Sequence, residues 1–131
     1  MSRLALTFAL LLATTAPAAA QSLSPMHANG ATPSDIKGFR LTVGNPYRGK
    51  MVFEIVPMDP KFRVVAADAE VNFPTLTLAP GTTRQVIVTF KITPSRKERT
   101  IGVCVQPKDL PGTVQPRVCG TYTGRLLSPG G

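Results

Sequence analysis

The sequence is poor in the residue types from which metal and redox sites are built. It has one histidine, His27, and two cysteines, Cys104 and Cys119, among 131 residues. One imidazole and two thiols do not supply the four ligands of a tetrahedral zinc site, and no Cys-x-x-Cys pair is present for redox chemistry. Met26 beside His27 is a pair that suits copper, but the other methionines do not extend it. We therefore predict no metal ion and no cofactor.

Catalytic groupings are missing as well. The serines after residue 20 fall in loops or near chain ends, and no histidine stands near a candidate nucleophile and base. The seven acidic residues are scattered over turns and strand faces. Residues 120–124 alternate as a strand does and do not form a phosphate-binding loop. We predict that the chain is not an enzyme.

Acidic residues are few in comparison with basic ones. Seven Asp and Glu stand against fifteen Lys and Arg, which gives a formal net charge of +8. Such a field favours acidic partners, although a charge of this size also keeps a small exported domain soluble. The basic residues are not interleaved with aromatic rings on which bases could stack, so we do not predict binding to nucleic acid.

Long apolar runs are confined to the start of the chain. Residues 1–20 have a basic beginning, an apolar stretch too short to span a bilayer, and three alanines before Gln21. These features predict a cleaved signal peptide and a periplasmic product with no membrane span. Cleavage removes one arginine and leaves a net charge of +7. The product is one domain, residues 21–131, with loose ends at 21–36 and 128–131.

Prolines divide the rest of the chain into short pieces. Twelve of the thirteen prolines lie after residue 20 and leave hardly any window for a helix. Apolar and polar residues alternate between them as in half-buried strands. The clearest case is residues 84–91. The same alternation predicts strands over residues 39–43, 51–56, 71–73, 76–78, 100–106 and 117–127, with residues 61–67 as a further candidate. We predict an all-β antiparallel sandwich of about seven strands. Its predicted core contains Val86, Val88, Phe90, Ile101 and Val103.

The two cysteines are expected to form one disulfide, because an exported chain enters an oxidising compartment. Free thiols and intermolecular pairing are the alternatives. If the last two strands form a hairpin with Cys104 opposite Cys119, Ile101 faces Tyr122 and both sulfurs lie on the outer face. A bridge between two sheets, as in antibody domains, is disfavoured because both cysteines would have to point inward and the chain has no tryptophan.

Several short motifs follow one another in a characteristic order. Residues 38–46 read Gly-Phe-Arg-Leu-Thr-Val-Gly-Asn-Pro, residues 76–81 read Leu-Thr-Leu-Ala-Pro-Gly, and residues 84–88 read Arg-Gln-Val-Ile-Val. An Arg-Lys-Glu-Arg loop follows at residues 96–99. Over residues 22–127 this order resembles the N-terminal domain of periplasmic pilus-assembly chaperones. The resemblance implies an immunoglobulin-like β-sandwich that binds another protein.

The anchoring residues of that family have no clear counterpart here. In the family, a first-strand arginine and a late lysine hold the carboxylate terminus of a pilus subunit between two domains. The matching positions in this chain hold His27 and, near the lysine, Gly124 and Arg125. The sequence also stops at Gly131, before a second domain. We therefore do not assign the anchoring roles to these residues.

What the resemblance retains is strand pairing. We predict a non-enzymatic binding module whose last strand, residues 121–127, lies at a sheet edge and pairs with a strand of an envelope or pilus protein. Because Tyr122 points inward, the predicted binding residues are Thr121, Thr123 and Arg125. The alternatives are a structural accessory subunit of an envelope or secretion assembly, and a small polyanion- or metal-binding protein. No particular oligomeric state is predicted.

Overall fold

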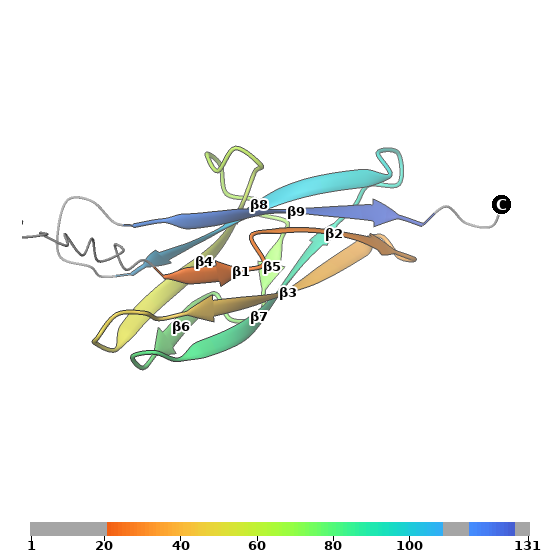
Figure 1. Cartoon of the computed structure of the whole chain (residues 1–131). Coiled ribbons are helices and arrows are strands. Elements are labelled where there is room, and N and C mark those ends of the chain that lie inside the picture. The colour runs from red at the N-terminus through yellow and green to blue at the C-terminus, as the bar shows by residue number, and fades with distance from the viewer. Residues whose placement is uncertain (1–20, 109–115, 128–131) are drawn as a thin grey trace, which may run out of the picture.

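The computed structural model describes residues 21–108 and 116–127, which form nine β-strands and no helix (Figure 1). None of these residues therefore belongs to a helix able to cross a membrane. The signal peptide expected at residues 1–20 and the loose end expected at 128–131 lie outside the described residues. The strands are β1 (Ser22–Ser24), β2 (His27–Thr32), β3 (Ile36–Gly44), β4 (Met51–Met58), β5 (Glu70–Val71), β6 (Thr75–Leu78), β7 (Thr83–Lys91), β8 (Glu98–Pro107) and β9 (Val118–Leu126).

The strands form two sheets packed around one core. The first sheet has the order β1-β3-β7-β5 and the second has the order β2-β9-β8-β4-β6. Every strand pair is antiparallel except β2 with β9, which is parallel. The predicted all-β sandwich with one disulfide is confirmed.

The first segment of the chain is more ordered than its composition suggests. Residues 21–36, which we expect to be a loose end, contain β1 and β2, and the two strands belong to different sheets. Pro25 lies at the crossing point, where the absence of an N–H prevents a continuous ladder. The buried Tyr122 hydroxyl donates a hydrogen bond of 2.5 Å to the Pro25 carbonyl and fixes the crossing.

Residues 61–67, a candidate strand by their alternation, form part of a loop instead. We call residues 59–66, the first part of this loop, the Asp59 loop. In it, the Asp59 carboxylate accepts hydrogen bonds from three backbone N–H groups. They belong to Lys61 (3.1 Å), Arg63 (2.6 Å) and Val64 (2.7 Å). A carboxylate that binds successive N–H groups favours a turn over a sheet ladder. Only one isolated bridge, between Met58 and Val65, remains.

The core confirms the predicted alternation. The five predicted core residues are all buried, with at most 1% of their surface exposed. Both sheets contribute, since β3 and β7 face β4, β8 and β9 across it. The largest fully buried side chains are those of Tyr122, Phe53 and Phe90.

Candidate binding edge

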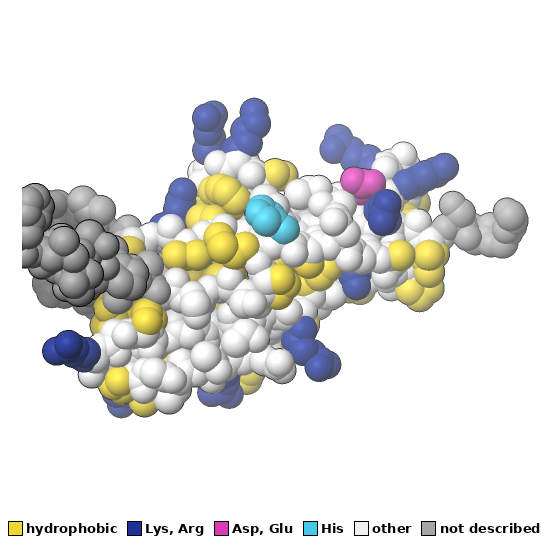
Figure 2. Space-filling view, in the orientation of Figure 1, with side chains coloured by type: hydrophobic (Ala, Val, Ile, Leu, Met, Phe, Trp, Pro, Cys, Tyr) yellow, Lys and Arg dark blue, Asp and Glu magenta, His cyan; other side chains and the backbone are white. Residues whose placement is uncertain are grey.

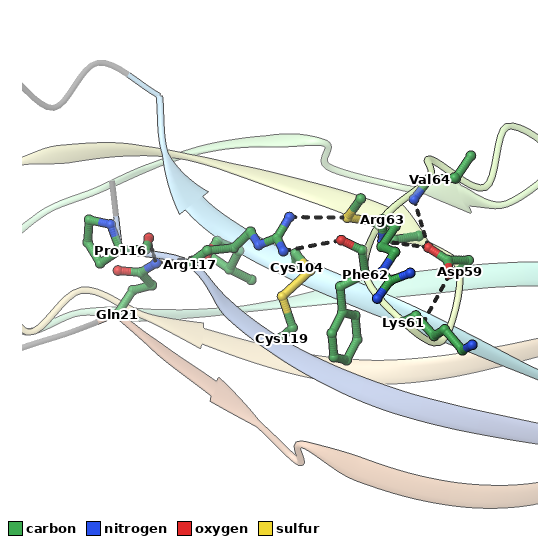
Figure 3. Close-up of a disulfide and its surroundings, with 12 residues drawn as sticks. Gln21, Asp59, Lys61, Phe62, Arg63, Val64, Cys104, Pro116, Arg117 and Cys119 are labelled. Atoms are coloured by element: carbon green, nitrogen blue, oxygen red, sulfur yellow. Dashed lines mark hydrogen bonds between the residues drawn. A yellow bond between two sulfur atoms is a disulfide. The ribbon is translucent and has the colours of Figure 1, made fainter. Parts of the chain in front are cut away.

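The disulfide fixes the register of the two strands next to the predicted edge. Cys104 of β8 lies opposite Cys119 of β9, and the two are bonded, so the predicted pairing is confirmed (Figure 3). Ile101 faces Tyr122, also as predicted. The bridge therefore joins neighbouring strands of one sheet and not the two sheets.

The outer face at the disulfide is covered by the Asp59 loop. The Phe62 ring packs over Gly102, where a Cβ atom would lie 2.6 Å from the ring. Arg117 donates to the Phe62 carbonyl at 3.2 Å, beside the two sulfurs (Figure 3). Cys104 thus points to the outer face and is still only 1% exposed.

The backbone edge of β9 is not free where we expect it to be. β2 runs parallel to β9 from His27 opposite Thr121 to Thr32 opposite Leu126. The Thr121 N–H donates to the Met26 carbonyl at 2.8 Å, and the Leu127 N–H donates to the Thr32 carbonyl at 2.9 Å. The expectation that residues 121–127 form the outermost strand is therefore wrong. Between Pro25 and Pro33, short polar and small residues do not alternate, so the sequence gives little signal of a strand there.

The predicted binding residues do share one face of β9. Thr121 and Thr123 are half-buried, Arg125 is exposed, and Tyr122 between them points into the core. The Thr121 hydroxyl lies 2.7 Å from Nδ1 of His27. The structure thus brings the single histidine next to one of the three predicted residues.

Side-chain hydrogen bonds across the strands already involve both threonines. The Thr123 hydroxyl lies 2.7 Å from the Thr100 hydroxyl on β8. Arg125 stands opposite Glu98 on one side and Ala31 on the other. The outer face of β2, β9 and β8 is therefore a polar surface whose most exposed predicted residue is Arg125.

The outermost strands of this sheet are β2 and β6, and β2 forms the edge next to β9. In a strand, the backbone groups of every second residue point to the same side. Because the Met26 and Thr32 carbonyls point to β9, the N–H and C=O groups of Ala28 and Gly30 also point to β9. The N–H and C=O groups of His27, Asn29 and Ala31 then point away from β9. No other strand among the described residues pairs with that side of β2. It is an open edge three residues long, bounded by Pro25 and Pro33.

The titratable groups near this surface have identifiable environments. Burial raises the pKa of Tyr122 to about 12. Hydrogen bonds from the N–H groups of Val64 and Arg63 hold the pKa of Asp59 below its ordinary value. No cluster of three His, Cys, Asp or Glu side chains within residues 21–108 and 116–127 is placed to hold a metal ion.

Comparisons with known proteins identify the fold. No protein-family model and no curated protein matches the sequence. Among solved structures, the E. coli chaperone DraB matches with a TM-score of 0.67 and 17% identity, over 86% of this chain and 57% of that one. The Salmonella enterica SafA pilin in complex with the SafB chaperone matches with a TM-score of 0.65 and 16% identity, over 86% and 57%. A PapD-like domain of human CEP192 matches with a TM-score of 0.60 and 13% identity, over 84% and 87%.

The chain therefore has the chaperone-like immunoglobulin fold. The predicted resemblance to pilus chaperones is confirmed at the level of the fold. The chain spans a little over half the length of the chaperone chains that it matches, and the identities are all low. The human domain shows that this fold also occurs outside pilus chaperones.

Proposed function

We propose that the protein is a non-enzymatic periplasmic binding module that pairs with a strand of an envelope or pilus protein. The observation that carries this proposal is the open edge of β2, where the outward backbone groups of His27, Asn29 and Ala31 are available to another strand. An exposed strand edge gives affinity through main-chain hydrogen bonds and specificity through alternate side chains. The chaperone-like fold supports the proposal, and the SafB structure is of a complex with a pilin.

The predicted residues of β9 keep a role in this arrangement. Thr121, Thr123 and Arg125 are the neighbours of the three outward residues of β2 on the same face. A strand added to β2 would place its side chains next to this row. We propose that the row selects the partner's side chains, with the exposed Arg125 favouring an acidic one.

Proline at Asn29 tests the mechanism. The backbone N–H of Asn29 points to the open edge. Asn29→Pro therefore removes one donor to a partner strand, while the hydrogen bonds from β2 to β9 remain. Asn29→Ala is the matched control, because it removes the side chain and keeps the N–H. We expect Asn29→Pro to lose the captured envelope or pilus protein in a pull-down from periplasmic extract, with identification by mass spectrometry. Asn29→Ala should retain it.

Folding is checked separately. Both variants should keep the circular dichroism spectrum of the parent and a melting temperature close to it, because residue 29 is exposed on an edge strand. Capture of the same protein at the same level by folded Asn29→Pro would exclude pairing at β2. Proline at residue 123 would not test pairing at β2, because the backbone N–H of Thr123 points to β2 and its loss would disrupt the pairing of β2 with β9.

A further inference from the structure

Two loops project from the same side of the sandwich and enclose a groove. One is the Asp59 loop between β4 and β5, and the other is the loop between β7 and β8, residues 92–97 (Figure 1). Residues from both line a groove of about 760 Å³. Its apolar lining includes Val64 and Val65, whose exposed fractions are 65% and 58%, above the buried Ile101.

Positive charge is concentrated on the two loops that bound this groove. Figure 2 shows Lys and Arg side chains standing on both projecting loops. Five exposed cations lie on the loops and at the end of β7, and within residues 21–108 and 116–127 none of them forms an ion pair. They are Lys61, Arg63, Lys91, Arg96 and Lys97. Lys91 and Arg96 line the groove, and the other three lie on the loops beside it.

The carboxylates at the groove are largely occupied. The oxygens of Asp59 accept the backbone N–H groups of its own loop. Both oxygens of Asp68 bind the Arg99 guanidinium, at 2.7 and 2.8 Å. Of the lining carboxylates, only Glu98 has no hydrogen bond or ion pair within the described part of the chain. Among the lining side chains, two free cations, Lys91 and Arg96, therefore stand against one free carboxylate. Lys61, Arg63 and Lys97 add three further cations on the loops beside the groove.

From this charge and shape we propose that the groove binds an acidic, extended protein segment that carries aliphatic side chains. Carboxylates of the segment would pair with the loop cations, and its aliphatic groups would cover Val64 and Val65. A groove with an apolar lining fits a polypeptide better than the flat phosphate layer of a membrane. This surface is separate from the open edge of β2 and does not depend on strand pairing there.

A synthetic peptide tests the proposal on the whole protein. The probe is fluorescein-labelled Glu-Val-Asp-Leu-Glu-Val-Asp, and the control peptide replaces each Glu by Gln and each Asp by Asn. We expect fluorescence anisotropy to show binding of the acidic peptide only, with an affinity that weakens as NaCl is raised because salt screens exposed charges. Equal binding of both peptides, or of neither, would overturn the proposal.

Charge-matched variants locate the site. Lys61→Gln with Arg63→Gln removes two cations from the Asp59 loop, and Arg96→Gln with Lys97→Gln removes two cations from the loop between β7 and β8. Each should weaken peptide binding by about tenfold. The control, Arg48→Gln with Lys50→Gln, removes the same charge from the exposed loop at the far end of β4 and should change affinity by less than about twofold. An equal loss in the control would show that only the net charge matters.

Two further experiments distinguish peptide binding in an apolar groove from docking of a charged surface on a membrane. Val64→Ser with Val65→Ser keeps every charge and should weaken peptide binding about as much as either loop-charge variant. Vesicles of equal parts phosphatidylglycerol and phosphatidylcholine provide the competing ligand. Sedimentation with these vesicles by a protein that does not bind the peptide would replace the proposal with a membrane-docking face.

Discussion

Tyr122 combines two functions in one side chain. Its ring is 1% exposed and packs 5.7 Å from the Phe39 ring, while its hydroxyl reaches the Pro25 carbonyl. A buried tyrosine usually needs such a partner, because an unpaired hydroxyl in the core is costly. Here the partner is the residue at which the chain crosses between sheets. One side chain therefore stabilises the core and the crossing.

The ionisation of Tyr122 makes the stability of the fold depend on alkaline pH. Burial raises the pKa of its phenol from 10.0 to about 12. The unfolded chain releases the proton near pH 10, whereas the native protein keeps it until about pH 12. The contribution of the neutral Tyr122 phenol to the free energy of unfolding is complete below pH 10 and is lost as the pH rises to about 12. We expect urea midpoints of the parent to fall over this range.

Tyr122→Phe is the variant that isolates this effect. It should cost about 1 kcal/mol at neutral pH through the lost hydrogen bond to Pro25. Its urea midpoint should then fall less than that of the parent as the solution becomes alkaline. Parallel curves for the two proteins would mean that other groups cause the alkaline loss.

At the scale of elements, the Asp59 loop and β8 depend on each other. Gly102 leaves room for the loop, because a Cβ atom there would lie 2.6 Å from both the Asp59 carbonyl and the Phe62 ring. The loop in turn covers the outer face beside the disulfide (Figure 3). A single side-chain carboxylate, that of Asp59, holds the turn in shape through its three N–H contacts.

Gly102→Ala should displace the loop. The added methyl group meets a backbone oxygen as well as a ring, so relief requires movement of the chain, at a cost of about 1–3 kcal/mol. We expect faster reduction of the disulfide by dithiothreitol, followed by thiol labelling, because the sulfurs lose their cover. Gly49→Ala, with no atom within 4 Å of the new methyl group, is the control. An unchanged reduction rate in Gly102→Ala would show that the loop does not protect the bond.

The elements also show what alternation can and cannot predict. Strands such as β7 and β8 bury one face, so apolar residues recur at every second position and the pattern is clear. The Asp59 loop carries a similar pattern by chance, and one carboxylate with its N–H partners overrides it. β2 is the converse case, a strand without an apolar pattern. Its residues are small or polar, and it is a strand because it pairs with β9.

At the scale of the whole molecule, the candidate site depends on contacts that are distant in sequence. The sequence predicted the hairpin of β8 and β9 because two cysteines 15 residues apart define its register. It did not predict that His27 lies beside Thr121, since 94 residues separate them and neither belongs to an apolar pattern. The predicted binding residues lie on the strand next to the open edge, and that edge lies one strand further out than predicted, on β2.

The disulfide should contribute substantially to the stability of this small sandwich. In the chain-entropy model, closing a loop of about 15 residues is worth about 3 kcal/mol, a large part of the 5–15 kcal/mol typical of domains. Cys104→Ala with Cys119→Ala should therefore lower the melting temperature by roughly 12–24 °C. The denaturant slope gives a second readout, because an unfolded chain without the bridge exposes more surface and the slope should rise. Loss of stability with an unchanged slope would instead assign the effect to packing around the buried Cys104 sulfur.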